Sequence, residues 1–158
     1  MRAYKMVVAF SLLLVALLGL QLLASPAKAS EITAEVNIVP EMFNLKRLDE
    51  QSGVITAYVS NLTKEGVSYN VRDINLSTVG LYYGESPVAE ALRTIVANDV
   101  LIVKFDASTV ANYIWFNILY HMGTIPPQDS KLVPLTLRGQ LNNGEKFAGT
   151  DTIKAMFP

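Results

Sequence analysis

The stretch KLVPLTLRGQLNNGEKFAGTDTIKAM, residues 131–156, carries the clearest structural signal in this chain. Its first half alternates between apolar and polar residues, with Val133, Leu135 and Leu137 on one side, which is typical of a half-buried strand. Asn143-Gly144 follows, a pair that readily adopts the positive φ angles of a tight turn. The second half returns as another strand, so the sequence predicts a β-hairpin.

Further strands are predicted upstream of this hairpin, and all are rich in alternating or β-branched residues. They cover Ile32–Val39, Val54–Ser60, Thr78–Tyr83 and Val100–Phe105. One helix is expected near 107–122, because Asp106 is a good N-cap and Gly123 can end it. This pattern predicts a mainly β fold, an antiparallel β-sandwich of about seven strands with one helix.

Two segments between these strands are less regular. Residues 61–69 are polar and contain Gly66, so a loop is expected there. Residues 88–96 fit either a helical turn or a strand. The local run Ala89-Glu90-Ala91-Leu92-Arg93 favours the helix.

The N-terminal 29 residues have the composition of an export signal. Arg2 and Lys5 precede an apolar run, Met6 to Ala24, and Ala27-Lys28-Ala29 offers a small-x-small cleavage site. The alternative is an uncleaved membrane anchor, because the apolar run approaches the roughly 20 residues that span a bilayer. We therefore predict a hydrophobic signal helix in 1–29, cleaved or retained, followed by a β-sandwich domain in 30–158.

Composition excludes several classes of protein. The chain has 158 residues and no cysteine, which rules out disulfides, thiol catalysis and thiolate metal sites. The net charge is -1, and loss of three basic leader residues would leave 10 basic and 14 acidic residues, a charge of -4. Nucleic acid is not an expected partner of such a chain. The predicted location is extracellular, periplasmic or at the cell surface, with membrane contact only through an uncleaved N-terminal segment.

Several strand and turn residues resemble a known module. The runs Asn44-Leu45-Lys46, Val54 to Val59, Tyr69 to Val79, Val100 to Asp106 and Leu135 to Ile153 resemble a β-sandwich module that recurs in secreted and cell-surface proteins of archaea and some bacteria. The resemblance implies an Ig-like sandwich and an extracellular, archaeal or bacterial setting. Relatives often carry an Asp- and Gly-rich calcium segment before the strand at Val100. Here Asn98 and Asp99 supply one amide and one carboxylate, so calcium is only a weak expectation and no cofactor is predicted.

Aromatic residues mark the predicted interaction surface. They lie in and just after the expected helix and beside a turn: Tyr113, Trp115, Phe116, Tyr120, Tyr82 and Tyr83. Such residues can form contacts with another subunit, with an envelope component or with sugar rings. The alternative is that they pack into the core. Two sequons, at Asn61 and Asn75, are candidate glycosylation sites.

No catalytic residues are predicted, because the only histidine, His121, has no motif around it and no nucleophile–base pair is evident. We expect a non-catalytic exported protein of the cell envelope or extracellular space that acts as a structural, adhesion or binding module. Its expected partners are a second copy, another envelope protein or a glycan. The alternative is a glycan-active enzyme or accessory module that uses loop carboxylates such as Glu85, Glu90, Asp99 and Asp106.

Overall fold

A computed structural model describes residues 31–45, 53–119 and 130–156 of the chain. The predicted leader, 1–29, lies outside the described residues. The elements are β1 (Ile32–Val39), β2 (Met42–Asn44), β3 (Val54–Lys64), β4 (Val67–Tyr69), η2 (Val71–Asp73), β5 (Ile74–Tyr83), β6 (Ser86–Glu90), β7 (Arg93–Ala97), β8 (Val100–Asp106), α2 (Ala107–Tyr113), η3 (Ile114–Leu119), β9 (Ser130–Leu141) and β10 (Lys146–Met156). The expectation of a mainly β fold with one helical segment is confirmed. In the described ranges, no helix is long and apolar enough to cross a membrane.

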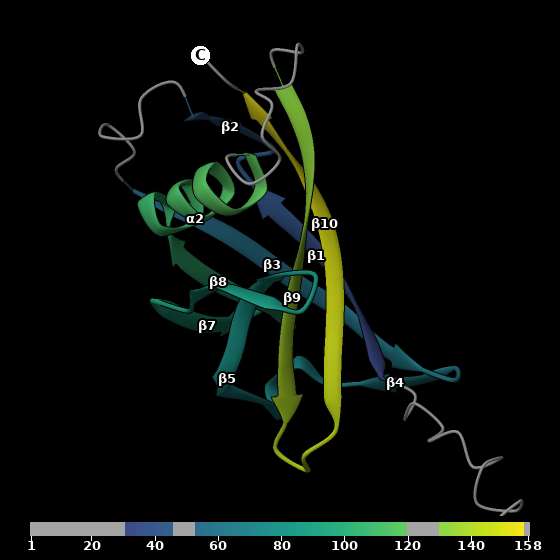
Figure 1. Ribbon diagram of the computed structural model, residues 1–158. Coiled ribbons are helices and arrows are strands. Elements are labelled where there is room, and N and C mark those ends of the chain that lie inside the picture. Colours follow the sequence, from purple (N-terminus) through teal and green to yellow (C-terminus); the bar gives the residue numbers. More distant parts are fainter. Residues whose placement is uncertain (1–30, 46–52, 120–129, 157–158) are drawn as a thin grey trace, which may run out of the picture. The chain divides into compact units, whose positions relative to one another are not determined.

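The strands join into one curled, hydrogen-bonded sheet (Figure 1). Its order is β6-β5-β9-β10-β1-β3-β8-β7, with β2 paired to β10 and β4 paired to β3. The described ranges thus hold ten strands where the sequence predicted about seven. The difference arises partly because the short strands β2, β4 and β6 lack a long alternating pattern of their own.

The predicted C-terminal hairpin is confirmed. β9 and β10 pair antiparallel from Gln140↔Lys146 to Ser130↔Met156. Gly144 has a φ of 88°, and its N–H donates to the carbonyl of Leu141 at 2.9 Å. The positive φ explains why a glycine stands at this turn.

The sheet is mixed, so the prediction of a purely antiparallel arrangement is wrong. β1 pairs parallel with β10 through Ile32↔Phe147 and then runs antiparallel to β3 as far as Val39↔Thr56. β2 also pairs parallel with β10. β9 occupies one side of β10 through the hairpin. The other side is filled by the first strands of the chain, which run in the same direction as β10.

β1 crosses β10 in direct contact at Gly149. A Cβ atom at Gly149 would lie 2.4 Å from the carbonyl oxygen of Ala34, so only glycine leaves room for the β1 backbone. Just beyond this point, the Ile38 N–H donates to a side-chain oxygen of Asp151 at 2.6 Å. A carboxylate of β10 thus bonds to the β1 backbone beyond Ile32 and Thr33, the two residues of β1 that pair with β10.

Two irregular segments differ from their sequence-based expectations. Residues 61–69 form the end of β3, a turn and β4 rather than a loop, with Asn61 (φ 49°) at a register shift between β3 and β1. Residues 88–96 form parts of β6 and β7 rather than the favoured helix, because pairing with β5 and β8 outweighs the local helix propensity.

The helix begins where the sequence predicts. The Asp106 Oδ1 atom accepts the Thr109 N–H at 2.7 Å, and α2 continues into the π-helical turn η3 as far as Leu119. Val110 and Ile114 are fully buried, which fixes α2 against the sheet. The predicted helix end near 122 lies outside the described residues.

The core lies on the inner side of the sheet, with Leu101, Val103 and Phe105 of β8 fully buried, as the alternation in that strand predicts. β1 starts near the β9–β10 turn, and its last residues lie toward the end of the sheet where α2 begins (Figure 1). The turn and the helix therefore mark opposite ends of the described fold.

Candidate ligand-binding surface

The two neighbouring tyrosines of β5 occupy different environments. Tyr83 packs against the hydrophobic core. Tyr82 is half-buried outside the core cluster, and a Cβ atom at Gly80 would lie 3.2 Å from its ring. The Tyr82 ring therefore lies along the sheet, over a residue that has no side chain to lift it.

The guanidinium group of Arg138, on β9, stacks over the Tyr82 ring. Its guanidinium carbon lies 5.2 Å from the ring centroid, which is cation–π distance. Glu85, in the turn between β5 and β6, accepts two guanidinium hydrogen bonds at 2.7 and 2.9 Å. The hydrogen bonds to Glu85 raise the pKa of Arg138.

Two threonines extend this surface across the sheet. Tyr82 is opposite Thr136, and Thr136 is opposite Thr150, so the three residues form one cross-strand row. The threonine hydroxyl oxygens lie 2.9 Å apart and share a hydrogen bond. Together with Glu85 and Arg138, these residues form what we call the Tyr82 surface. It offers a guanidinium group, a carboxylate, two threonine hydroxyl groups and the edge of a tyrosine ring whose face Arg138 covers.

The helical aromatic residues do not share one environment. Tyr113 and Trp115 are partly buried against the core. The Phe116 side chain is 54% exposed on η3. Tyr120 lies outside the described residues. The predicted set is thus divided between core contacts, an exposed Phe116 and the separate Tyr82 surface.

The two sequon asparagines make local hydrogen bonds. The Asn61 side-chain amide donates to Glu35 at 2.5 Å. The Asn75 side-chain oxygen accepts the Ser77 hydroxyl at 2.7 Å. A glycan on Asn61 would have to replace the hydrogen bond from its amide nitrogen to Glu35. The bond between Asn75 and the Ser77 hydroxyl uses the side-chain oxygen of Asn75, not the amide nitrogen that would carry a glycan.

Asn98 and Asp99, the weak calcium candidates, form the tight turn between β7 and β8. Their φ angles are 49° and 57°, the conformation of a two-residue hairpin turn. The Asp99 Oδ1 atom lies 3.5 Å from the Arg72 Nε atom. A cation at this turn would therefore compete with Arg72 for the carboxylate. In the parts of the chain that the structure describes, no three acidic or histidine side chains gather into a metal cluster.

Three of the four candidate loop carboxylates, Asp106, Glu85 and Asp99, make contacts within the fold. Asp106 caps α2, where hydrogen bonds from the Ser108 hydroxyl and from Thr109 lower its pKa. Glu85 holds Arg138, and Asp99 lies beside Arg72. Glu90 ends β6 with an exposed side chain.

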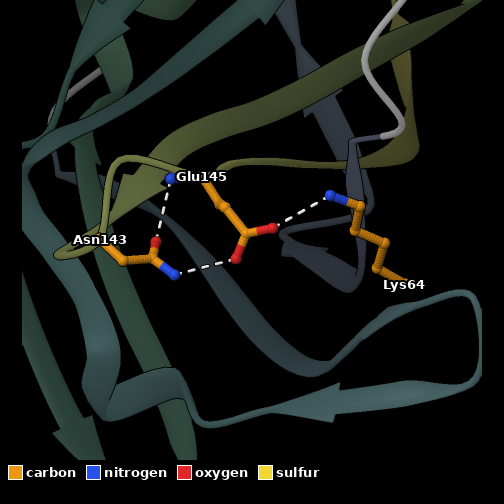
Figure 2. Close-up of polar contacts among 3 residues, drawn as sticks. All are labelled: Lys64, Asn143 and Glu145. Atoms are coloured by element: carbon orange, nitrogen blue, oxygen red, sulfur yellow. Dashed lines mark hydrogen bonds and ion pairs between the residues drawn. The ribbon is translucent and has the colours of Figure 1, made fainter.

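A second polar cluster joins β3 to the β9–β10 turn (Figure 2). The Lys64 Nζ atom donates to Glu145 Oε1 at 3.0 Å, and the Asn143 amide donates to Glu145 Oε2 at 2.9 Å. These bonds lower the pKa of Glu145, and the bond to Glu145 raises the pKa of Lys64. Both carboxylate oxygens of Glu145 accept hydrogen bonds, so the cluster links β3 to the β9–β10 hairpin. We call these three residues, Lys64, Asn143 and Glu145, the clasp.

Sequence reasoning missed both polar clusters. Arg138 and Glu85 are 53 positions apart, and Lys64 and Glu145 are 81 positions apart. No pattern within a short stretch of sequence predicts contacts between residues so far apart. The available signals were the two turns, since Glu85 and Asn143 both stand in predicted turn segments.

Comparison with known proteins finds few similarities to this chain. No protein-family model matches the chain, and no curated protein matches it. Among solved structures, the chain is similar to the full extracellular region of plexin A4, with a TM-score of 0.44 and 12% sequence identity. The match covers 78% of this chain and 10% of the plexin chain, so the chain spans about a tenth of that protein's length.

Proposed function

We propose that this protein is an exported, non-catalytic binding module of the cell envelope or extracellular space, and that the Tyr82 surface binds a saccharide. The observation that carries the proposal is the set of polar groups around the Tyr82 ring, namely the Arg138–Glu85 pair and the Thr136–Thr150 hydroxyl pair. The leader pattern in 1–29 supports export.

The chemistry of the surface suits a polyhydroxylated ring. Gly80 lies beneath the Tyr82 ring and Arg138 covers its other face, so a saccharide meets the ring at its edge, and its hydroxyl groups need both donors and acceptors around that edge. Arg138 supplies N–H donors, Glu85 supplies carboxylate oxygens, and the threonines supply hydroxyl groups that can act either way. The bidentate Arg138–Glu85 pair orients these groups before a ligand arrives, which reduces the entropy lost on binding.

We also propose that the curled sheet forms two facing layers of an Ig-like β-sandwich. The support is β1, which pairs with β10 only at Ile32 and Thr33 but with β3 from Thr33 to Val39. Leu101 of β8 and Leu135 of β9 are both fully buried, as inward residues of two opposed layers would be.

The test is retention of the full-length protein, purified in a mild detergent, on immobilised cell-wall polysaccharide. Tyr82→Ala should lower affinity about tenfold or more, which corresponds to about 1.4 kcal/mol. Tyr58→Ala is the matched control, because Tyr58 is a 40% exposed tyrosine on β3, away from the Tyr82 surface. Equal losses in the two variants, or no retention of the unmodified protein, would overturn the saccharide proposal. Release of reducing ends would favour the glycan-active alternative instead.

A further inference from the structure

The two ends of the sheet differ in how their edges are protected. The strand order ends at β6 on one side and at β7 on the other. β6 contains Pro87, which has no N–H to donate, and its pairing with β5 shifts register between Leu81 and Tyr82. Proline and bulges are two devices by which edge strands avoid pairing with other chains.

β7 carries neither device. Its sequence, Arg-Thr-Ile-Val-Ala, has no proline or glycine, and its pairing with β8 is regular from Arg93 to Ala97. Within the described ranges β7 pairs with β8 alone, so alternate N–H and C=O groups along its other side are left for a further strand. Thr94, Ile95 and Val96 are half-buried, which gives a new strand apolar surface to cover.

We propose that two copies of this chain pair antiparallel along β7, centred on Ile95. In this register Ile95 faces the same residue of the other copy, Thr94 faces the partner's Val96, and Arg93 faces the partner's Ala97. All five residues of β7 then take part in the new ladder. The contact lies at the far end of the strand order from β5 and β9, so it goes beyond the proposed saccharide surface and does not depend on it.

Charge complementarity favours a second copy in this orientation. Arg93 is the one charged residue of β7, and Asp99 lies two residues beyond Ala97. The two-fold axis places each Arg93 opposite the partner's Ala97, at the end of β7 that leads directly into the Asn98-Asp99 turn, so the long arginine side chain lies near the partner's Asp99. Asp99 is available for this contact because its side chain is 78% exposed and only one 3.5 Å ion pair holds it. Parallel pairing in register would instead place the two Arg93 side chains together, which is unfavourable.

Cysteine crosslinking of the full-length protein tests the register directly, because the natural chain contains no cysteine. Cα atoms of directly opposed antiparallel residues are about 4.5–5.5 Å apart, within the range that a disulfide spans. Ile95→Cys should therefore give a covalent dimer under mild oxidation. Asn37→Cys, an exposed position on the inner strand β1, is the control for random collision.

A second set of variants tests the charge argument in the Ile95→Cys background. Arg93→Asp should slow crosslinking at least about tenfold, and adding Asp99→Arg should restore it. A thermal melt of each variant shows that the fold is retained. The proposal is overturned if Ile95→Cys crosslinks no faster than Asn37→Cys, or if the charge reversal does not restore crosslinking. Saccharide retention by the same variants tells failure of this contact apart from failure of the Tyr82 surface.

Discussion

Replacing Gly149 with alanine tests the direct contact between β1 and β10. The new Cβ atom would lie 2.4 Å from the Ala34 carbonyl oxygen, whereas an ordinary C···O contact is about 3.3 Å or longer. The β1 backbone must therefore move by roughly 0.9 Å, estimated from those two distances. Gly149 does not need a positive φ, so the steric contact is the main cost of the substitution.

The expected destabilisation follows from three contributions. Overpacking costs about 1–3 kcal/mol, and weakening of the Ile38–Asp151 hydrogen bond costs about 1 kcal/mol. The lower entropy of the unfolded alanine chain returns about 0.4–1 kcal/mol. The net loss is about 2 kcal/mol, which for a domain of this size lowers Tm by roughly 8 °C.

The assay is thermal and urea unfolding of Gly149→Ala beside Gly80→Ala. Gly80 is also a strand glycine, but its nearest obstacle is the Tyr82 side chain at 3.2 Å, which can rotate away. Gly80→Ala should change stability by less than about 0.5 kcal/mol. The reasoning fails if Gly149→Ala melts like the unmodified protein, or if Gly80→Ala loses as much stability.

Three further predictions concern the helix cap, the hairpin clasp and the core. Asp106→Ala should lower Tm by a few degrees at pH 7, whereas Asp106→Asn should keep most of the stability because its amide oxygen still caps α2. Since the folded pKa of Asp106 is lowered, its contribution to the free energy of unfolding is present above the ordinary aspartate pKa of about 4 and is lost as the pH falls through the folded pKa. Equal melting temperatures of Asp106→Ala and the unmodified protein at pH 7 would contradict the capping role. Glu145→Gln should lower Tm slightly at neutral pH and low salt, and the difference should vanish in acid, because the pKa of Glu145 is also lowered; a difference that persists at pH 2 would argue against the ion pair. Leu101→Ala should cost about 2–5 kcal/mol in urea unfolding, because the side chain is fully buried, and a loss below about 1 kcal/mol would contradict its place in the core.

Local patterns predicted the elements whose signals lie within a few residues. The alternation around Leu135, the turn at Gly144 and the cap at Asp106 each depend on short-range stereochemistry, and the structure confirms all three. The segment containing Ala89 shows the limit of such reasoning. Its residues favour a helix in isolation, yet pairing with β5 places it in β6.

Long-range pairing accounts for what the sequence did not predict. Ile32 and Phe147 pair although 115 positions separate them, and no periodicity within either strand specifies a parallel partner. The candidate site shows the same limit. The turn beside Tyr82 was visible in the sequence, but the arginine that covers the ring comes from another strand, and Tyr83 could be assigned to the core only once the sheet was known.

The direction of β1 determines at which end of the described fold the N-terminal residues join it. The described fold begins at Glu31, next to the strand ends that contain Phe147 and Lys64. From there β1 runs about 23 Å toward the end of the fold where α2 begins. Any group attached ahead of Glu31 is therefore covalently joined at the end of the fold that carries the Lys64–Glu145 clasp, and the length of β1 separates that junction from the end where α2 begins.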